Sequence, residues 1–231
     1  MKRSEINLAI KKAKAAMEAI NFKLPYFAEW GPEQWNENKD KIDNIKEVML
    51  GWDVTDFGTG DFAHVGAVLF TMRNGNLYNE KAGVPYCEKA IVFMDDEKQV
   101  IPYHFHNNKT EDIINRGNGI MEIELYHSTP DGKIDYETEN VEVYMDGICC
   151  TVKAGEILEV MPGNSITLTP GLYHRFGAKK GSGNLVAGEV SKINDDNLDN
   201  VFADEQKRFS DIIEDEPVLH PLCNEYDAIS R

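Results

Sequence analysis

The amino-acid sequence predicts an all-β protein built as an antiparallel barrel or jelly roll. From about residue 65 to residue 191, short apolar runs alternate with Gly, Asn, Asp and Pro, a pattern typical of strands joined by turns. About nine or ten such runs occur, without long helical stretches between them. Strands joined directly by turns are antiparallel neighbours, so the runs favour a closed or two-layered antiparallel sheet.

The chain before this region predicts two helices. Residues 4–22 carry apolar side chains at helical spacing beside a lysine-rich face, and Ser4 is the expected N-cap. A second helix is expected after Gly31, with a proline in its first turn and Gly51 at its end. We therefore expect residues 1–51 to form a helical extension that covers the barrel.

Each predicted strand ends at a turn signal. The run 65–73 precedes Asn74-Gly75, a dipeptide that favours a tight hairpin turn. The run 100–106 carries two histidines, and the run 185–191 carries a glutamate inside an apolar stretch. The other expected strands are 89–94, 120–127, 141–145, 148–152, 157–161 and 165–169.

The C-terminal segment, residues 193–231, is acidic and lacks regular apolar periodicity. Charge runs of this kind usually form a solvated surface, so we expect the segment to wrap around the outside of the barrel. The expected organisation is one domain over residues 1–231, with the barrel at residues 52–192.

Composition and charge narrow the choice of partners. The formal net charge of −16 and the pI near 4.8 disfavour phosphate backbones and anionic surfaces, so neither nucleic acid nor a membrane is an expected partner. The N-terminal residues lack the apolar core of a signal peptide or a spanning helix. The four cysteines contain no CxxC pair, which argues against a disulfide framework. We expect a cytoplasmic protein.

Potential metal ligands cluster within one short stretch, at His104, His106 and Glu111. On a strand the side-chain period is two, so both imidazoles project from one face and the carboxylate can fold back to join them. His174 is the best candidate for a fourth ligand, because the preceding Pro170-Gly171 turn delivers it at the start of a strand. Imidazole and carboxylate suit a divalent first-row metal. The remaining histidines are expected to be ordinary packed or surface residues: His64, His127 and His220.

The order of these four residues resembles the motifs of the cupin superfamily, in which His-x-His and a following Glu are completed by a distant His. The glycine that the first motif places before its histidines is absent here, and Gly117 follows one residue early. Ala178 stands where the second motif has asparagine. These departures concern the turns and leave the four ligands intact. The resemblance implies a cupin barrel, a double-stranded β-helix or jelly roll, around one metal ion.

A closer resemblance links most of the chain to the D-lyxose ketol-isomerases, a family of cupin sugar isomerases. It rests on the stretches LGWDVTDFG, PYCEKAIVFM, PYHFHNNKTEDIINRGNG, IELYHSTPDG, TLTPGLYHRFG and GEVSKINDDNLDN. The resemblance implies a divalent cofactor, with Mn²⁺ as the first choice, and interconversion of an aldose with its 2-ketose. D-lyxose and D-xylulose are the leading pair, and D-mannose and D-fructose are the second.

An aldose–ketose isomerase must also move a proton between C1 and C2, through a cis-enediol, and two residues are candidates for this step. Lys109 lies between the second histidine and Glu111, and its alternative role is that of a solvated turn lysine. Glu189 is the candidate carboxylate partner, because a charge inside an apolar strand is seldom buried without a role. Strand alternation leaves open that Glu189 faces solvent.

Residues outside this pair are candidates for contacting the sugar. Lys89 is expected to bind sugar hydroxyls, with protection of a sheet edge as its alternative role. Glu205 is expected to contact the substrate. Glu205 and Glu214 also compete with Glu189 for the role of second acid–base group, which the family resemblance places late in the chain.

Two other functions use the same ligands. One is a cupin dioxygenase that holds iron, and the other is a non-enzymatic protein that only binds sugar. The polar run 107–110 beside the ligands suits a polyol better than a dioxygenase substrate. Exposed sheet edges in barrels of this type often pair, so we expect a homodimer.

Overall fold

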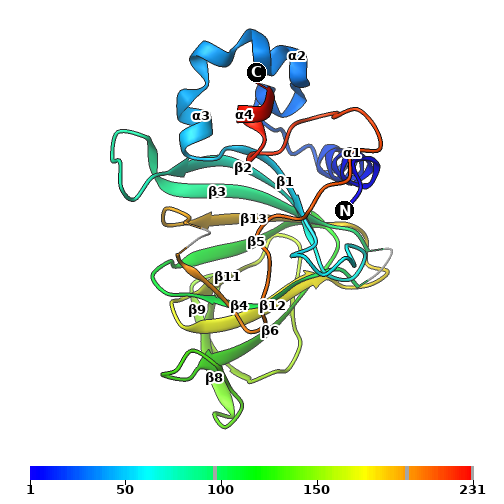
Figure 1. Cartoon of the computed structure of the whole chain (residues 1–231). Helices are drawn as coiled ribbons and strands as arrows, with labels where there is room; N and C mark the ends of the chain where they lie inside the picture. The colour runs from blue at the N-terminus through cyan, green and yellow to red at the C-terminus, as the bar shows by residue number, and fades with distance from the viewer. Residues whose placement is uncertain (96–97, 196–197, 230–231) are drawn as a thin grey trace.

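The computed structural model describes residues 1–95, 98–195 and 198–229, and it shows a helical layer lying above the strands (Figure 1). The helices are α1 (Arg3–Ala19), η1 (Tyr26–Glu29), α2 (Pro32–Glu37), η2 (Lys39–Lys41), α3 (Asp43–Glu47) and α4 (Tyr226–Ile229), of which η1 and η2 are 3-10 helices. The strands are β1 (Gly51–Thr55), β2 (Ala67–Gly75), β3 (Gly83–Phe93), β4 (Val100–His106), β5 (Glu111–Asn118), β6 (Met121–Ser128), β7 (Ile134–Asp135), β8 (Asn140–Met145), β9 (Ile148–Lys153), β10 (Leu158–Val160), β11 (Ser165–Leu168), β12 (Leu172–Ala178), β13 (Leu185–Ser191) and β14 (Asn200–Phe202).

The strands form two antiparallel sheets. The larger sheet has the order β1-β2-β3-β13-β5-β11-β8-β9, and the smaller has the order β10-β6-β12-β4-β14 with β7 paired to β6. Neighbouring strands run antiparallel in both sheets. β13 lies between β3 and β5, strands that are distant from it in the sequence. The predicted all-β antiparallel architecture is confirmed.

An inner apolar core fills much of the space between the two sheets. Ile91, Ile113 and Ala187 of the larger sheet belong to it, as do Leu125 and Phe176 of the smaller sheet, and none is more than 2% exposed. Full burial of a large apolar side chain stabilises a fold by about 1.5–3 kcal/mol. The candidate site described below shares this space, so the core fixes the walls on which the site is built.

An outer apolar core joins the helical layer to the opposite face of the larger sheet. Ile6 and Ile10 of α1 pack in one cluster with Trp52 of β1 and Phe70 of β2. The Trp52 indole N–H is satisfied by the Ala28 carbonyl oxygen at 2.9 Å. The N-terminal helices therefore cover this part of the larger sheet, as expected, and β1 and most of β2 are buried on both faces.

The first predicted helix is present as α1, but its N-cap is Lys2 rather than Ser4. Glu5 accepts a hydrogen bond from the Lys2 backbone N–H at 2.7 Å. Ser4 lies in the first turn, where its backbone N–H and Oγ donate to the Asp215 carboxylate at 2.9 and 2.7 Å. The prediction of a Ser4 cap was wrong, because the Ser4 hydroxyl donates its hydrogen bond to Asp215 of the C-terminal segment.

The second predicted helix is divided into α2, η2 and α3. Asn38 lies at the first break, and its Nδ2 donates to the Gln34 carbonyl oxygen at 2.9 Å. Such local side-chain bonds compete with continuation of a helix. Among the described residues, no helix combines the length and the apolar character needed to cross a membrane.

Asn74-Gly75 does not form the predicted two-residue turn. β2 continues through Gly75, which pairs with Gly83 of β3, and residues 76–82 make the connection. The buried Asn74 side chain instead bonds the backbone of Asn194, accepting from its N–H at 2.9 Å and donating to its carbonyl oxygen at 3.1 Å. A partner distant in sequence therefore replaces the local turn.

The described residues contain fourteen strands, more than the nine or ten predicted. β1, β5, β7 and β14 were not predicted. The inner face of β5 alternates polar and apolar residues, with Glu111 and Asn115 buried on either side of Ile113, so it lacks the apolar pattern of a core strand. β7 and β14 contain 2 and 3 residues, which is too short for a recognisable period.

The C-terminal segment wraps around the molecule, as expected. Its strand β14 extends the smaller sheet beside β4, and the Lys207 N–H then donates to the Phe57 carbonyl oxygen at 3.0 Å. The segment ends at α4, where Tyr226 stacks on Trp35 of α2 with ring centroids 4.2 Å apart. In Figure 1 the orange-to-red trace follows this course from the strands to the helical layer. The segment thereby joins both sheets to the helices.

Candidate metal centre and active site

A β-bulge in β4 turns His104 toward the space between the sheets. His104 pairs with His174 of β12, whereas Ile101 pairs with Phe176, so β4 has one more residue than β12 over this stretch. The extra residue allows Ile101 and His104 to share the inner face although they are three positions apart. Pro102 lies inside the bulge, where its missing N–H donor is tolerated.

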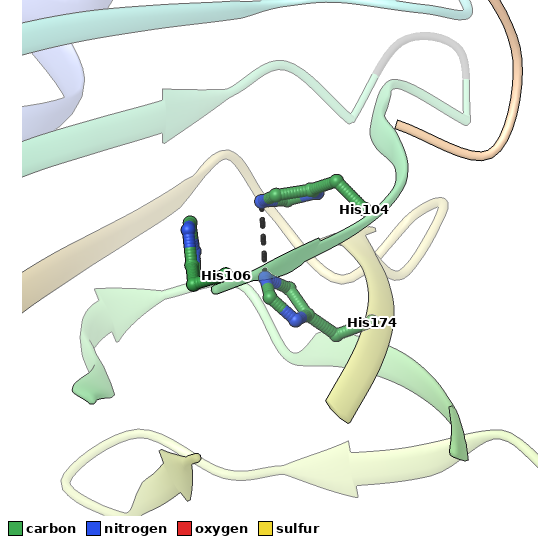
Figure 2. Close-up of side chains that lie close together, drawn as sticks. All are labelled: His104, His106 and His174. Atoms are coloured by element: carbon green, nitrogen blue, oxygen red, sulfur yellow. Dashed lines mark hydrogen bonds between the residues drawn. The ribbon is translucent and has the colours of Figure 1, made fainter. Parts of the chain in front are cut away.

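Four candidate ligand side chains converge at one point, and Figure 2 shows the three imidazoles turned toward one another. The Nε2 atoms of His104 and His174 are 3.0 Å apart. Glu111 Oε1 lies 3.2 Å from His106 Nε2 and 3.3 Å from His174 Nε2. All four residues are buried. The structure thus brings together the four ligands that the sequence predicted.

Contacts behind the imidazoles orient them. The Nδ1 atoms of His104 and His174 each lie 2.9 Å from a backbone carbonyl oxygen, that of Pro102 and that of Leu172. A carbonyl oxygen can only accept, so Nδ1 carries the proton and the Nε2 lone pair faces the centre. His106 Nδ1 faces Asp199 Oδ2 at 3.4 Å. Outer contacts of this kind fix the orientation of histidines that bind metals.

The chemistry of the donor set fits a divalent cation. Two Nε2 lone pairs that face each other at 3.0 Å repel unless a positive charge lies between them. Burial lowers the pKa of His104 and of His174, so protonation of either ring is disfavoured. Three imidazoles and one carboxylate suit a first-row divalent metal, and a metal with six coordination positions would keep two for substrate.

A row of alternating charges leads away from the ligands along the larger sheet. Lys109 Nζ lies 2.8 Å from Glu111 Oε2 and 2.9 Å from Glu189 Oε1. Lys89 Nζ lies 3.3 Å from Glu189 Oε2, and the two residues are paired across β3 and β13. All of these side chains are buried on the inner face. The structure therefore excludes a solvated Lys109, a solvent-facing Glu189 and an edge position for Lys89.

The charged neighbours determine the protonation of this row. Burial alone would lower the pKa of Lys109, but the carboxylates of Glu111 and Glu189 outweigh it and raise the pKa. Burial alone would raise the pKa of Glu189, but the ammonium groups of Lys109 and Lys89 lower it. Lys109 is therefore held as an ammonium and Glu189 as a carboxylate, each stabilised by the other.

A cavity joins these residues to the candidate ligands. Three of the ligands, both lysines and Glu189 line it, together with apolar side chains of the inner core. Glu205, expected to contact the substrate, is exposed and is not among the lining residues. Glu214 lies on another face, where it pairs with Arg3 of α1 at 2.7 Å. Glu205 and Glu214 therefore both lie apart from the cavity.

The other predicted features take ordinary positions. His64 is exposed beside Asp61, at 2.9 Å, and His220 packs against Trp52 with ring centroids 6.4 Å apart. His127 lies half-buried on β6. Within the described part of the chain, no disulfide joins the cysteines.

Three residues of the site were missed, and all come from the C-terminal segment. Asp199 faces His106 and accepts a hydrogen bond from the Asn108 backbone N–H at 2.7 Å. Asn194 Oδ1 accepts from Lys109 Nζ at 3.1 Å. Arg208 also lines the cavity. Asn194 and Asp199 lie in the stretch GEVSKINDDNLDN, but its many amide and acidic residues cannot be ranked without the fold.

Comparison with known proteins identifies the family. A family model described as D-lyxose isomerase matches residues 1–226. The chain belongs to the D-lyxose isomerase family. It is 41% identical over 228 residues to the D-lyxose/D-mannose isomerase of Serratia proteamaculans, and 41% identical over 229 residues to that of Escherichia coli O157:H7. Both alignments cover 98% of this chain and 98% of the relative.

Solved structures of other sugar isomerases share the fold of this D-lyxose isomerase family member. The ligand-free L-ribose isomerase of Cellulomonas parahominis has a TM-score of 0.58 at 16% identity, covering 92% of this chain and 98% of that one. The L-ribose isomerase of Geodermatophilus obscurus has a TM-score of 0.56 at 14% identity, with the same coverage. The likeness confirms the predicted cupin-type barrel.

Proposed function

We propose that this chain is a divalent-metal-dependent aldose–ketose isomerase that interconverts D-lyxose with D-xylulose and D-mannose with D-fructose. The observation that carries the proposal is the buried convergence of His104, His106, His174 and Glu111 beside the Lys109–Glu189 pair. The names of the two relatives, both D-lyxose/D-mannose isomerases, support this choice of sugars.

The four converging side chains are the residues that would hold the ion, and we propose Mn²⁺ as the first choice. A divalent ion there would supply Lewis acidity toward the carbonyl and the neighbouring hydroxyl of the sugar. Glu111 also accepts from Lys109 Nζ, so the same carboxylate would link the ion to the charged row. The dense packing around the imidazoles fixes their positions before the substrate arrives.

We propose that Glu189 and Lys109 move the protons. Glu189, as a carboxylate, would accept the proton from C2 of the aldose and return it to C1, so that the reaction passes through a cis-enediol. The hydroxyl proton would pass from O2 to O1, and Lys109, held as an ammonium, is placed to give a proton to O1 first and then, as the amine, to regain one from O2. Because the two groups share a hydrogen bond of 2.9 Å, a change of charge on one is compensated by the other. Lys89 would hold Glu189 in position from the opposite side.

Membership of an isomerase family decides against the two alternatives raised by the sequence, a dioxygenase and a sugar-binding protein without turnover. The expected homodimer stays a prediction, which sedimentation of the purified protein would test.

Turnover of free sugars by the purified protein tests the proposal. We expect D-lyxose and D-mannose to be converted to their ketoses when a divalent ion is supplied, and we expect no oxygen uptake with iron. Each aldopentose and aldohexose would be assayed with each ion by chromatography of the products. Isomerisation of neither D-lyxose nor D-mannose with any ion would refute the proposed function.

A further inference from the structure

The hydroxyl of Ser191 is a buried polar group beside the proton-transfer pair, and no step proposed above uses it. Ser191 is the last residue of β13 and is 7% exposed. It follows Glu189 by two positions, so the two side chains project from the same face of the strand. In the sheet Ser191 lies opposite Glu111 of β5. The hydroxyl therefore belongs to the wall that carries both a candidate ligand and the candidate base.

The Ser191 hydroxyl donates to one particular oxygen of the Glu189 carboxylate. Ser191 Oγ lies 3.0 Å from Glu189 Oε1, and Lys109 Nζ lies 2.9 Å from the same oxygen. A carboxylate oxygen offers about two lone-pair sites, so these two donors occupy Oε1. Lys89 Nζ lies 3.4 Å from Oε1 and 3.3 Å from Oε2, so this lysine does not distinguish the two oxygens.

The occupation of Oε1 makes Oε2 the oxygen that is available to a proton. Glu189 lines the cavity beside the candidate ligands, whereas Ser191 is not among the lining residues. Ser191 can therefore act on a substrate only through Glu189. Proton transfer depends closely on where the accepting atom lies, and an error of about 1 Å in a reacting group can slow a reaction by about 10²-fold.

A hydrogen bond to a catalytic carboxylate changes both its basicity and its orientation. In the proposed reaction Glu189 accepts the proton from C2 and returns it to C1. A change in basicity therefore helps one of these transfers and hinders the other, whereas a correct orientation helps both. Donors that are already in place before the substrate binds are typical of preorganised sites. The main contribution expected from Ser191 is the orientation of Glu189.

We propose that Ser191 is a positioning residue for the proton transfer, whose hydroxyl anchors Glu189 Oε1 so that Oε2 faces C1 and C2 of the sugar. The inference rests on the proposed function, in which Glu189 carries the proton. Ser191 itself neither gains nor loses a proton. The competing explanation is structural, because the hydroxyl also lies 2.8 Å from the Lys192 carbonyl oxygen and could serve only to fix the chain where β13 ends.

Substitutions of Ser191 in the metal-loaded protein separate these explanations. Ser191→Ala removes the hydroxyl with little change in volume. Ser191→Thr and Ser191→Val form a matched pair, since both add a β-branched side chain of similar shape and only the first keeps a hydroxyl. β-Branched residues suit strands, so this pair gives the answer if Ser191→Ala does not fold.

Ser182→Ala is the control outside the site. The Ser182 hydroxyl also donates to a carbonyl oxygen close to it in the chain, that of Lys179, at 2.7 Å. It lies in the connection between β12 and β13, beyond the opposite end of β13 from Ser191. Its loss therefore reproduces the removal of a local hydroxyl bond without touching Glu189.

The readouts are kcat, KM, metal content, melting temperature and the isotope effect with D-lyxose deuterated at C2. We expect Ser191→Ala to lower kcat by roughly tenfold to a hundredfold, the range for a lost hydrogen bond to a charged group. KM and metal content should stay close to those of the wild type. The slowed kcat should show a full primary isotope effect, because cleavage of the C–H bond then limits turnover. Ser191→Thr should recover most of the loss, Ser191→Val should not, and Ser182→Ala should match the wild type.

The inference is overturned if Ser191→Ala and Ser191→Val turn over D-lyxose as fast as the wild type. It is also overturned if Ser191→Thr and Ser191→Val lose equal activity, if the loss follows a loss of metal, or if the slowed variants show no isotope effect. In each of these cases the wild type isomerises the sugar and the proposed function stands. A wild type that isomerises no sugar refutes the proposed function and the inference with it, so the two failures are distinguishable.

Discussion

The ammonium group of Lys109 contacts three residues of the proposed site: Glu111, Glu189 and Asn194. We predict that Lys109→Ala retains the metal and loses most turnover, by roughly 10²- to 10⁴-fold in kcat, the usual contribution of a positioned acid or base. Metal analysis and steady-state kinetics with D-lyxose measure the two properties separately.

Lys192→Ala is the control for this prediction, because Lys192 is a nearby lysine with an exposed side chain. Its turnover should match the wild type. Unchanged kcat in Lys109→Ala would assign the proton transfer to another group, and loss of metal would make Lys109 a structural residue.

Asp199 acts on the centre through His106, which its carboxylate faces at 3.4 Å. We predict that Asp199→Asn weakens metal binding by about 10- to 100-fold, because outer contacts of this kind orient the ligand and raise its basicity. Turnover should recover when the ion is supplied in excess. Titration with a competing chelator measures the affinity, and an unchanged affinity would remove Asp199 from the centre.

The sequence predicted the four candidate ligands because three of them lie close together in the chain, at the end of β4 and the start of β5. His174 was found through the Pro170-Gly171 turn before it. Asp199 could not be found this way, because its contact with His106 joins residues far apart in the chain. Its local sequence is typical of a solvated loop.

At the scale of elements, the C-terminal segment is bound to α1 by charged hydrogen bonds. Arg3 is fully buried and donates to Glu214 at 2.7 Å and also to Glu225. The hydrogen bond from Arg3 lowers the pKa of Glu214. A lowered pKa in the folded state stabilises the fold above the unfolded value, about 4.3, and the effect is lost as pH falls through the folded value.

We predict that Arg3→Met lowers the free energy of unfolding by about 1–3 kcal/mol at pH 7. Glu214 is more than half exposed, so solvent screening keeps its own share small. The difference between wild type and variant should shrink below about pH 4, where Glu214 becomes protonated. Urea denaturation at both pH values measures it, and an equal difference at both would contradict the electrostatic explanation.

Strands were predictable where apolar residues dominate the run, as in β4 and β13, whose limits match the predicted runs 100–106 and 185–191. β5 was missed because the site itself occupies its buried face, with Glu111 at its first position. The Asn74-Gly75 turn failed for a related reason, since Asn74 supports the backbone of Asn194. In β5 and at Asn74, residues that serve the site therefore stand where the sequence would otherwise show the apolar pattern of a strand or the residues of a turn.

At the scale of the whole molecule, the two sheets and the helical layer bring distant segments to one site. β4 and β12 supply the histidines, β5 and β13 supply the carboxylates, and the C-terminal segment supplies residues that face them. The barrel class followed from the number and spacing of apolar runs. The pairing of β13 with both β3 and β5 did not, because it joins segments about 70 to 100 residues apart in the chain.

We propose that one divalent ion, held by the four converging side chains, is required for sugar isomerisation. The most direct test is to titrate Mn²⁺ into exhaustively chelated protein while measuring D-lyxose turnover. We predict no turnover without the ion, a rise in proportion to added Mn²⁺, and a plateau at one ion per chain. Full activity in the chelated protein, with no response to added metal, would show that the isomerisation needs no metal ion.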